Sequence, residues 1–95
     1  MKDPIMIKVL WDLEDDPRGN VIHIAEHDVT PEEVEEVLND RHSHTVYSAS
    51  SGRPITFGWS ETGRYLAIVW EVIEEDPLTI YPITVYPAPE PRIGK

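Results

Sequence analysis

Cysteine is absent from the sequence, basic residues are scarce, and no long apolar run occurs. Without cysteine the chain forms neither a disulfide nor a thiolate metal site, so a reducing compartment is the simplest environment to expect. Acidic residues follow the first few apolar ones, which leaves too short a stretch for a signal peptide, and no segment approaches the length that spans a bilayer. We therefore expect a cytoplasmic protein that has no membrane partner.

The charge balance is strongly acidic, since eight Lys and Arg residues against eighteen Asp and Glu residues give a formal net charge of −10. Nucleic-acid affinity depends largely on cations that displace counterions from phosphates, so this balance disfavours an RNA or DNA partner unless a local basic patch exists. The few cations are spread thinly along the chain. An acidic surface favours either simple solubility or a basic protein partner.

Length and composition indicate one globular domain. Hydrophobic residues make up 40% and charged residues 27% of the chain, and neither an internal repeat nor a low-complexity tract interrupts it. A chain of 95 residues can bury a core of its own but leaves no room for a second domain. We predict a single domain over residues 1–88, followed by a flexible, proline-rich tail over residues 89–95.

Two short helices are expected in the first half of the sequence, and the first of them starts near a proline. Asp16 followed by Pro17 is a typical pair of N-cap and first helical residue, and it predicts a helix that runs to about His27. Its buried stripe would comprise Val21, Ile24 and Ala25.

The second helix has the clearest local signal in the chain. Thr30 is a good cap, Pro31 suits the first turn, and Glu33 completes a capping box three residues after Thr30. Glutamates crowd the N-terminal half, where the helix dipole favours anions, and they predict a solvated acidic face. The buried face would comprise Val34, Val37 and Leu38.

The remaining apolar segments have the alternation and β-branched content of strands. Pro82 cannot donate to a strand ladder, so the last strand is expected at a sheet edge or at a bulge. The order of elements predicts an α+β fold in which two helices pack on one face of a mostly antiparallel sheet of four to five strands. The expected strands are Ile5–Trp11, Thr45–Ser48, Pro54–Ser60, Tyr65–Ile73, which would be the sheet centre, and Thr79–Tyr86.

The sequence HIAEH places His23 and His27 four residues apart with Glu26 beside the second, a pattern known from inverted zinc-protease helices. A catalytic zinc needs a third protein ligand, for which His42 and His44 are candidates, and a general base. Patterns of five residues recur by chance, so we favour an ordinary helix face and expect neither a metal nor another cofactor.

Three segments in a fixed order carry a family resemblance: a strand ending in Trp11 and Asp12, the stretch HIAEHDVTPEEVEEVL, and the later strand GRYLAIVW. Together they resemble the BrnT family of toxins, part of the RelE-like superfamily, over roughly Ile7 to Tyr86. The resemblance implies a RelE-like domain that cleaves RNA without a metal as the toxin of a type II toxin–antitoxin pair. A small DNA-binding antitoxin would be its partner. Trp11 and Asp12 fit packing and capping better than chemistry.

The resemblance also implies site residues. His27 falls on the family histidine, Thr30 on the helix cap, Glu33 on the following glutamate, and Arg64 on the arginine that opens the central strand. In this hypothesis Arg64 binds the scissile phosphate, while His27, together with His23, transfers protons near neutral pH.

Several positions depart from the family pattern. Glu26 stands where the family has lysine, Asp28 replaces a glycine, and Ile83–Tyr86 lacks the arginine that ends the family's last strand. The alternative hypothesis is therefore a non-catalytic protein-interaction domain that keeps the fold. In that case the histidines would anchor their helix to the sheet, and Arg64 would pair with a nearby glutamate, Glu61 or Glu71.

Overall fold

The computed structural model describes residues 7–91 and confirms the α+β class. Ile5, Met6 and the last four residues of the predicted tail lie outside the described residues. Within residues 7–91, no helix is long and apolar enough to cross a membrane. In chain order the elements are β1 (Lys8–Val9), α1 (Asn20–Ala25), α2 (Pro31–Leu38), β2 (His44–Tyr47), β3 (Pro54–Trp59), β4 (Tyr65–Glu75) and β5 (Leu78–Pro87).

The strands form one mixed sheet in the order β1-β5-β4-β3-β2, with β4 at its centre as predicted. The pairs β2–β3, β3–β4 and β4–β5 are antiparallel, whereas β1 joins β5 in parallel. Within the described residues, the first strand ends at Val9 and not at Trp11 as predicted. The N–H of Leu10 still donates to the carbonyl of Ile80 at 2.9 Å, and the chain then leaves the sheet. Asp12 is thereby free to contact α1.

Pro82 lies beside a bulge, one of the two environments predicted for it. β5 is not an edge strand, since β1 pairs with it at Thr79 and Ile80. Along β4 the pairing shifts, so that Val69 faces Thr84 and the next residue faces Pro82. The pairing with β1 ends at Ile80, so at Pro82, within the described part of the chain, β5 has no strand on the side away from β4, and the Pro82 carbonyl on that side accepts from Asn20 instead. The missing N–H of proline is tolerated there.

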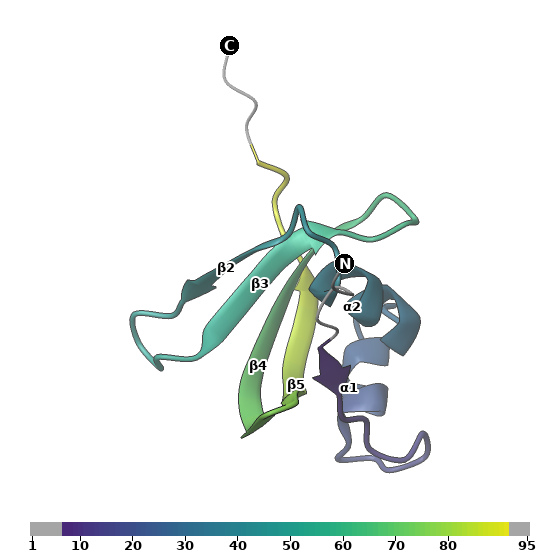
Figure 1. The fold of residues 1–95 in the computed structure, drawn as a ribbon. Helices are drawn as coiled ribbons and strands as arrows, with labels where there is room; N and C mark the ends of the chain where they lie inside the picture. Colours follow the sequence, from purple (N-terminus) through teal and green to yellow (C-terminus); the bar gives the residue numbers. More distant parts are fainter. Residues whose placement is uncertain (1–6, 92–95) are drawn as a thin grey trace, which may run out of the picture.

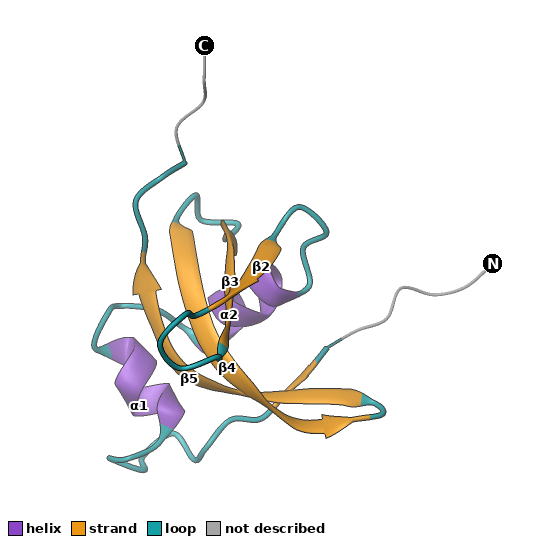
Figure 2. Ribbon diagram, turned by 90° about the vertical axis from the view of Figure 1, so that its left-hand side faces the viewer, coloured by secondary structure: helices purple, strands orange, loops and turns teal. Residues whose placement is uncertain are grey.

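Both helices cover the same face of the sheet (Figure 1), and in the turned view α2 lies behind the strands and α1 beside β5 (Figure 2). Gly58 on β3 permits close packing, because a Cβ atom there would lie 2.9 Å from Cγ1 of Val37 and 2.0 Å from Oγ of Ser43. The core between helices and sheet comprises Ile24, Val29, Val34, Val37, Leu38, Leu66, Ile68, Trp70, Ile80 and Val85, so the predicted buried face of α2 is confirmed.

The prediction for α1 was wrong at its start and in part of its buried stripe. The helix begins at Asn20 after Gly19, which has no side-chain cap, and ends at Ala25, which is exposed. Asp16 instead accepts a hydrogen bond from the backbone N–H of Arg18 at 3.0 Å, so it stabilises a turn before the helix. The buried residues of α1 are Asn20 and Ile24, so a polar side chain belongs to the buried stripe that was predicted to be apolar.

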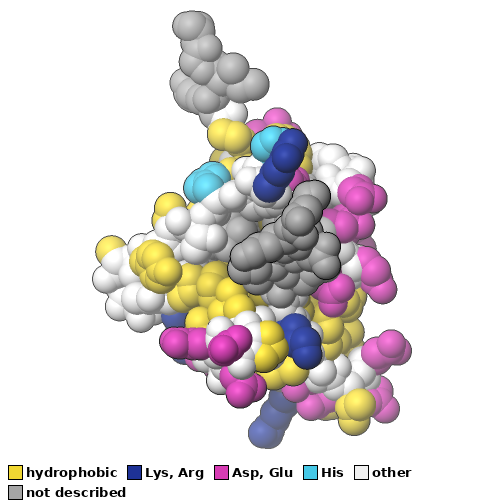
Figure 3. Space-filling model, viewed as in Figure 1, with side chains coloured by type: hydrophobic (Ala, Val, Ile, Leu, Met, Phe, Trp, Pro, Cys, Tyr) yellow, Lys and Arg dark blue, Asp and Glu magenta, His cyan; other side chains and the backbone are white. Residues whose placement is uncertain are grey.

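Within residues 7–91, the opposite face of the sheet carries no helix. On β3, buried Thr56 and Gly58 point toward the helices, so the intervening Phe57 and Trp59 point away from them. The ring of Phe57 stacks 5.5 Å from that of His44 and 6.2 Å from that of Tyr65, which in turn lies 5.0 Å from Trp59. Figure 3 shows hydrophobic side chains gathered on the sheet side of the molecule and acidic ones over the helices.

Candidate functional site

Arg64 stands at the end of the β3–β4 turn and extends its guanidinium across to the connection between the helices. Nη1 donates to the carbonyl of Asp28 and to Oε1 of Glu33 at 3.3 Å, and Nη2 donates to the carbonyl of His27 at 3.0 Å. The Arg64 side chain is 30% exposed and that of Glu33 only 9%. The salt-bridge partner is thus Glu33 on α2, and not Glu61 or Glu71 as the alternative hypothesis had it.

Glu33 gathers polar groups from two elements. Oε2 accepts hydrogen bonds from Thr62 at 2.6 Å and Ser60 at 3.2 Å, while Oε1 accepts from the backbone N–H of Thr30 at 3.4 Å. The hydroxyl of Thr30 accepts from the N–H of Glu33 at 3.2 Å, which confirms the predicted capping box. Burial alone would raise the pKa of Glu33, but the hydrogen bonds from Thr62, Thr30 and Ser60 and the charge of Arg64 together lower it.

We call Thr30, Glu33, Ser60, Thr62 and Arg64 the Glu33 cluster. It connects the start of α2 to the β3–β4 turn, and through Arg64 it also contacts the two carbonyls that follow α1. Its cation and its anion neutralise each other, and all three guanidinium contacts are with groups of the protein itself. The cluster is therefore suited to holding elements together.

The structure brings the backbone of His27 to Arg64, whereas the side chains of His23 and His27 are exposed. Nδ1 of His23 lies 3.8 Å from a carboxylate oxygen of Glu26, and the His23 side chain is 48% exposed. Their role in proton transfer stays a prediction. Among the described residues, no group of three or more His, Cys, Asp or Glu side chains could hold a metal ion.

Asp28, where the resemblance implies glycine, has a positive φ of 62°. Its N–H donates to the carbonyl of Ala25 at 2.9 Å, and the N–H of Val29 donates to that of Ile24 at 3.3 Å. These are the two hydrogen bonds of a Schellman motif, in which the residue of positive φ is usually glycine. Val29 and Ile24 then meet in the core, so this turn aims the chain toward α2.

Asp12 supplies the missing cap of α1 from outside the helix. Its carboxylate accepts from the backbone N–H of Asn20 at 2.9 Å, and its own N–H donates to the Asn20 side-chain oxygen at 2.9 Å. The side-chain NH₂ of Asn20 donates to the carbonyls of Leu10 at 3.0 Å and Pro82 at 3.2 Å. A Cβ atom at Gly19 would lie only 2.6 Å from Cβ of Asp12, so glycine permits this close approach.

Tyr81 on β5 donates its hydroxyl to the same Asp12 carboxylate. This hydrogen bond and the one from Asn20 lower the pKa of Asp12. Conversely, the hydrogen bond to Asp12, with burial and nearby carboxylates, raises the pKa of Tyr81 to about 12. We call Asp12, Asn20 and Tyr81 the Asp12 cluster; it fastens α1 to β5 and agrees with the capping role expected of Asp12.

Sequence reasoning missed the partners that complete both clusters. Ser60 and Thr62 are turn residues whose sequence signal is only that of a hairpin, and Asn20 and Tyr81 carry no local signal of their roles. Asparagine just after glycine at a helix start is a weak hint of capping, but its partner lies eight residues earlier.

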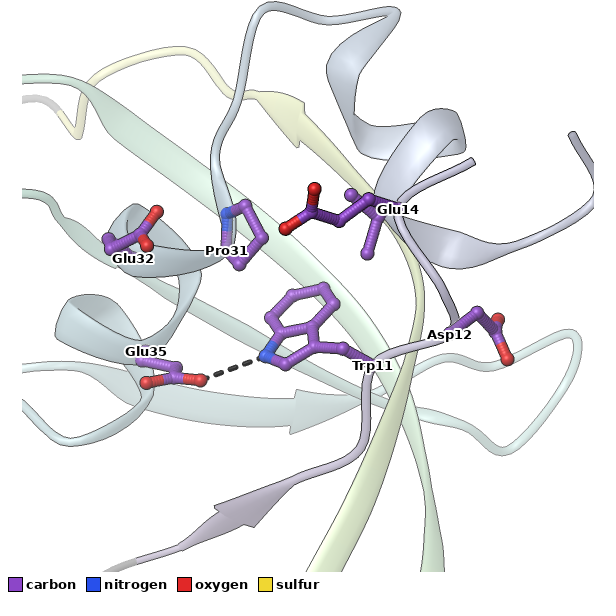
Figure 4. A pocket seen from close by; sticks show the side chains of 7 residues that line it. Trp11, Asp12, Glu14, Pro31, Glu32 and Glu35 are labelled. Carbon is purple, nitrogen blue, oxygen red and sulfur yellow. Dashed lines mark hydrogen bonds between the residues drawn. The ribbon is translucent and has the colours of Figure 1, made fainter. Parts of the chain in front are cut away.

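A cavity of about 280 Å³ opens between the segment after β1 and the start of α2. Figure 4 shows the ring of Trp11 facing α2, with Nε1 donating to Oε2 of Glu35 at 2.8 Å. The carboxylate of Glu14 points toward Pro31, whereas that of Asp12 is turned away from the ring. We call this the Trp11 cavity; its lining residues are Trp11, Asp12, Glu14, Val21, Pro31, Glu32 and Glu35.

Comparison with known proteins returned no match to any family model, to any curated protein or to any solved structure.

Proposed function

We propose that this chain is a non-catalytic protein-interaction domain of RelE-like, BrnT-related topology that binds a basic partner protein. The observation that carries the proposal is the state of Arg64, whose guanidinium is already paired with Glu33 and two backbone carbonyls. Phosphate binding at this position would have to displace a buried carboxylate of the protein itself, and that carboxylate repels phosphate.

The charge on the helix side supports the choice of a basic partner. Acidic side chains gather over the helices (Figure 3), and Glu32 and Glu35 on α2 are exposed. With a formal net charge of −10, the chain attracts a cationic protein at long range and repels a polyanion. An antitoxin-like, DNA-binding protein, the partner that the family resemblance implies, would have the required basic surface.

The experiment compares RNA with a basic peptide. Purified protein is incubated with a labelled single-stranded RNA, and separately titrated by calorimetry with a lysine- and arginine-rich helical peptide and with its charge-reversed counterpart. We expect intact RNA and 1:1 binding of the basic peptide that weakens as salt rises. RNA cleavage, or equal binding of the two peptides, would overturn the proposal.

The second candidate is the metal-independent endoribonuclease implied by the resemblance. The observation in its favour is that two positions assigned to it, His27 and Arg64, are adjacent, with Nη2 of Arg64 at 3.0 Å from the His27 carbonyl. For this activity the guanidinium would have to exchange Glu33 for a phosphate, and an exposed imidazole would serve as acid or base. If the protein cuts RNA and Arg64→Ala or His27→Ala abolishes cutting, the nuclease replaces the first proposal.

A further inference from the structure

The Trp11 cavity lies outside both polar clusters except for its contact with Asp12, and it is small. Its volume of about 280 Å³ falls below the range of roughly 300–1,000 Å³ that is usual for small-molecule sites. Trp11, Val21 and Pro31 provide apolar walls against which a hydrocarbon stem can pack.

Charge decides which kind of side chain fits. Glu14, Glu32 and Glu35 line the cavity together with the indole ring, and among the described residues neither lysine nor arginine lines it. An anion would be repelled, whereas a cation would contact both the carboxylates and the face of the ring. Of these three carboxylates, only that of Glu35 accepts a hydrogen bond from the indole, and it does so through one of its two oxygens.

The flat ring favours arginine over lysine. A guanidinium stacks on an aromatic face and binds carboxylates through several N–H groups in one plane, whereas an ammonium group is a compact, strongly hydrated charge. The bond from Nε1 of Trp11 to Glu35, at 2.8 Å, fixes the ring before any partner arrives. Such pre-organisation reduces the entropy lost on binding.

We propose that the Trp11 cavity receives an arginine side chain of the basic partner protein, with the guanidinium against the indole of Trp11 and between the carboxylates of Glu14 and Glu32. The inference rests on the proposed function and adds to it the point of contact and the residue recognised.

The test uses the basic helical peptide in three forms, in which the same positions are arginine, lysine or citrulline, the last being an uncharged analogue of arginine. Binding to the full ¹⁵N-labelled chain is followed by NMR at the indole N–H signals, with that of Trp11 identified by its loss in Trp11→Phe. We expect the arginine peptide to bind at least about tenfold more tightly than the citrulline peptide and to shift the Trp11 signal. The Trp70 signal should stay in place, because its Nε1 donates to Thr56 in the core.

Variants of exposed glutamates separate a local contact from general attraction. Glu14→Gln/Glu32→Gln removes two charges from the cavity, and Glu74→Gln/Glu75→Gln removes two at the β4–β5 hairpin, outside the cavity lining. We expect the first pair to weaken the arginine peptide about fivefold and the second less than twofold. Equal effects of the two pairs, or lysine and citrulline peptides that bind as tightly as the arginine peptide, would overturn the inference.

The two proposals fail in different ways. If the basic peptide still saturates at 1:1 without a shift of the Trp11 signal, the cavity assignment is wrong and the proposed function stands. If the peptide does not bind at all, the proposed function is wrong as well.

Discussion

The two helices lie in one layer, yet their first turns are stabilised in different ways. α2 begins with its own cap, since Thr30 and Glu33 exchange two hydrogen bonds within four residues. α1 has only Gly19 at that position, and the capping carboxylate is that of Asp12, eight residues before the first helical residue, Asn20. A helix of six residues such as α1 is too short to persist alone, so it depends on the sheet-side segment that carries its cap.

This difference separates local from tertiary stabilisation. Removing the cap of α2 weakens a helix whose apolar face still packs on the sheet. Removing the Asn20 side chain leaves polar groups of two other segments without this partner, namely the segment after β1 and β5, and the bond to β5 is buried. We therefore expect the α1 anchor to be the more sensitive of the two.

The largest effect is expected for Asn20→Ala. The carbonyls of Leu10 and Pro82 and the N–H of Asp12 each lose a partner at a side chain that is 2% exposed. We expect the free energy of unfolding to fall by about 3 kcal/mol, measured by urea denaturation. Asn39→Ala, at the exposed end of α2, should cost about 1 kcal/mol or less. Equal losses for the two asparagines would contradict the dependence of α1 on its distant anchor.

Glu33→Ala should come next in size. The change removes the carboxylate that accepts from Thr62, Ser60 and Arg64 and leaves the guanidinium without its counter-charge. Because Arg64 is 30% exposed and water can reach it, we expect a loss of about 2 kcal/mol rather than that of a fully buried pair. Glu32→Ala, on the exposed side of the same turn, serves as the control and should change stability by about 0.5 kcal/mol or less.

The difference between local and tertiary stabilisation also explains which parts of the structure could be predicted from the sequence. The capping box of α2, the central position of the long apolar strand β4 and the bulge near Pro82 were predicted from patterns of neighbouring residues, and all three are found. The predicted start of α1 was wrong because Asp16 and Pro17 give a strong local signal for a helix start. The first N–H of the observed helix is instead capped by the carboxylate of Asp12.

The candidate site was predictable only in part, for the same reason. The positions of Glu33 and Arg64 could be singled out, but their pairing joins residues 31 apart, and Ser60 and Thr62 reach Glu33 over 27 and 29 residues. Register and turn geometry determine such contacts, and no local pattern encodes them. The Trp11 cavity likewise requires the chain to turn after Leu10, which the predicted longer strand did not allow.

Acid should act on the α2 anchor in a defined pH range. The pKa of Glu33 is lowered in the folded protein, so its contribution to stability is fully present above the ordinary glutamate pKa of about 4.3. As the pH falls below that value, the unfolded chain takes up a proton that the folded chain does not, and stability is lost until the pH passes the lower folded pKa.

Glu33→Gln removes this contribution, so we expect its stability to fall less steeply than that of the wild type between pH 5 and pH 3, roughly the range in which an ordinary glutamate titrates. Urea denaturation across that range measures the slope, and Glu32→Gln supplies the control with the same charge change on an exposed residue. Parallel slopes for the wild type and Glu33→Gln would show that Glu33 gains nothing from its hydrogen bonds. The remaining acid sensitivity of Glu33→Gln includes that of Asp12, whose pKa is also lowered.

The smallest effect, and the only gain, is expected at the end of α1. Asp28 has a φ of 62°, a conformation that glycine adopts without a Cβ penalty, so Asp28→Gly relieves strain but adds entropy to the unfolded chain. We expect a net increase in stability of about 0.5 kcal/mol. Glu26→Gly makes the same charge change two residues earlier at a φ of −63°, where glycine relieves nothing, and should lower stability by about 1 kcal/mol. Opposite signs for these variants would show that the backbone at Asp28, and not the loss of a negative charge, sets the cost of ending α1; a loss of stability in both would contradict the strain at Asp28.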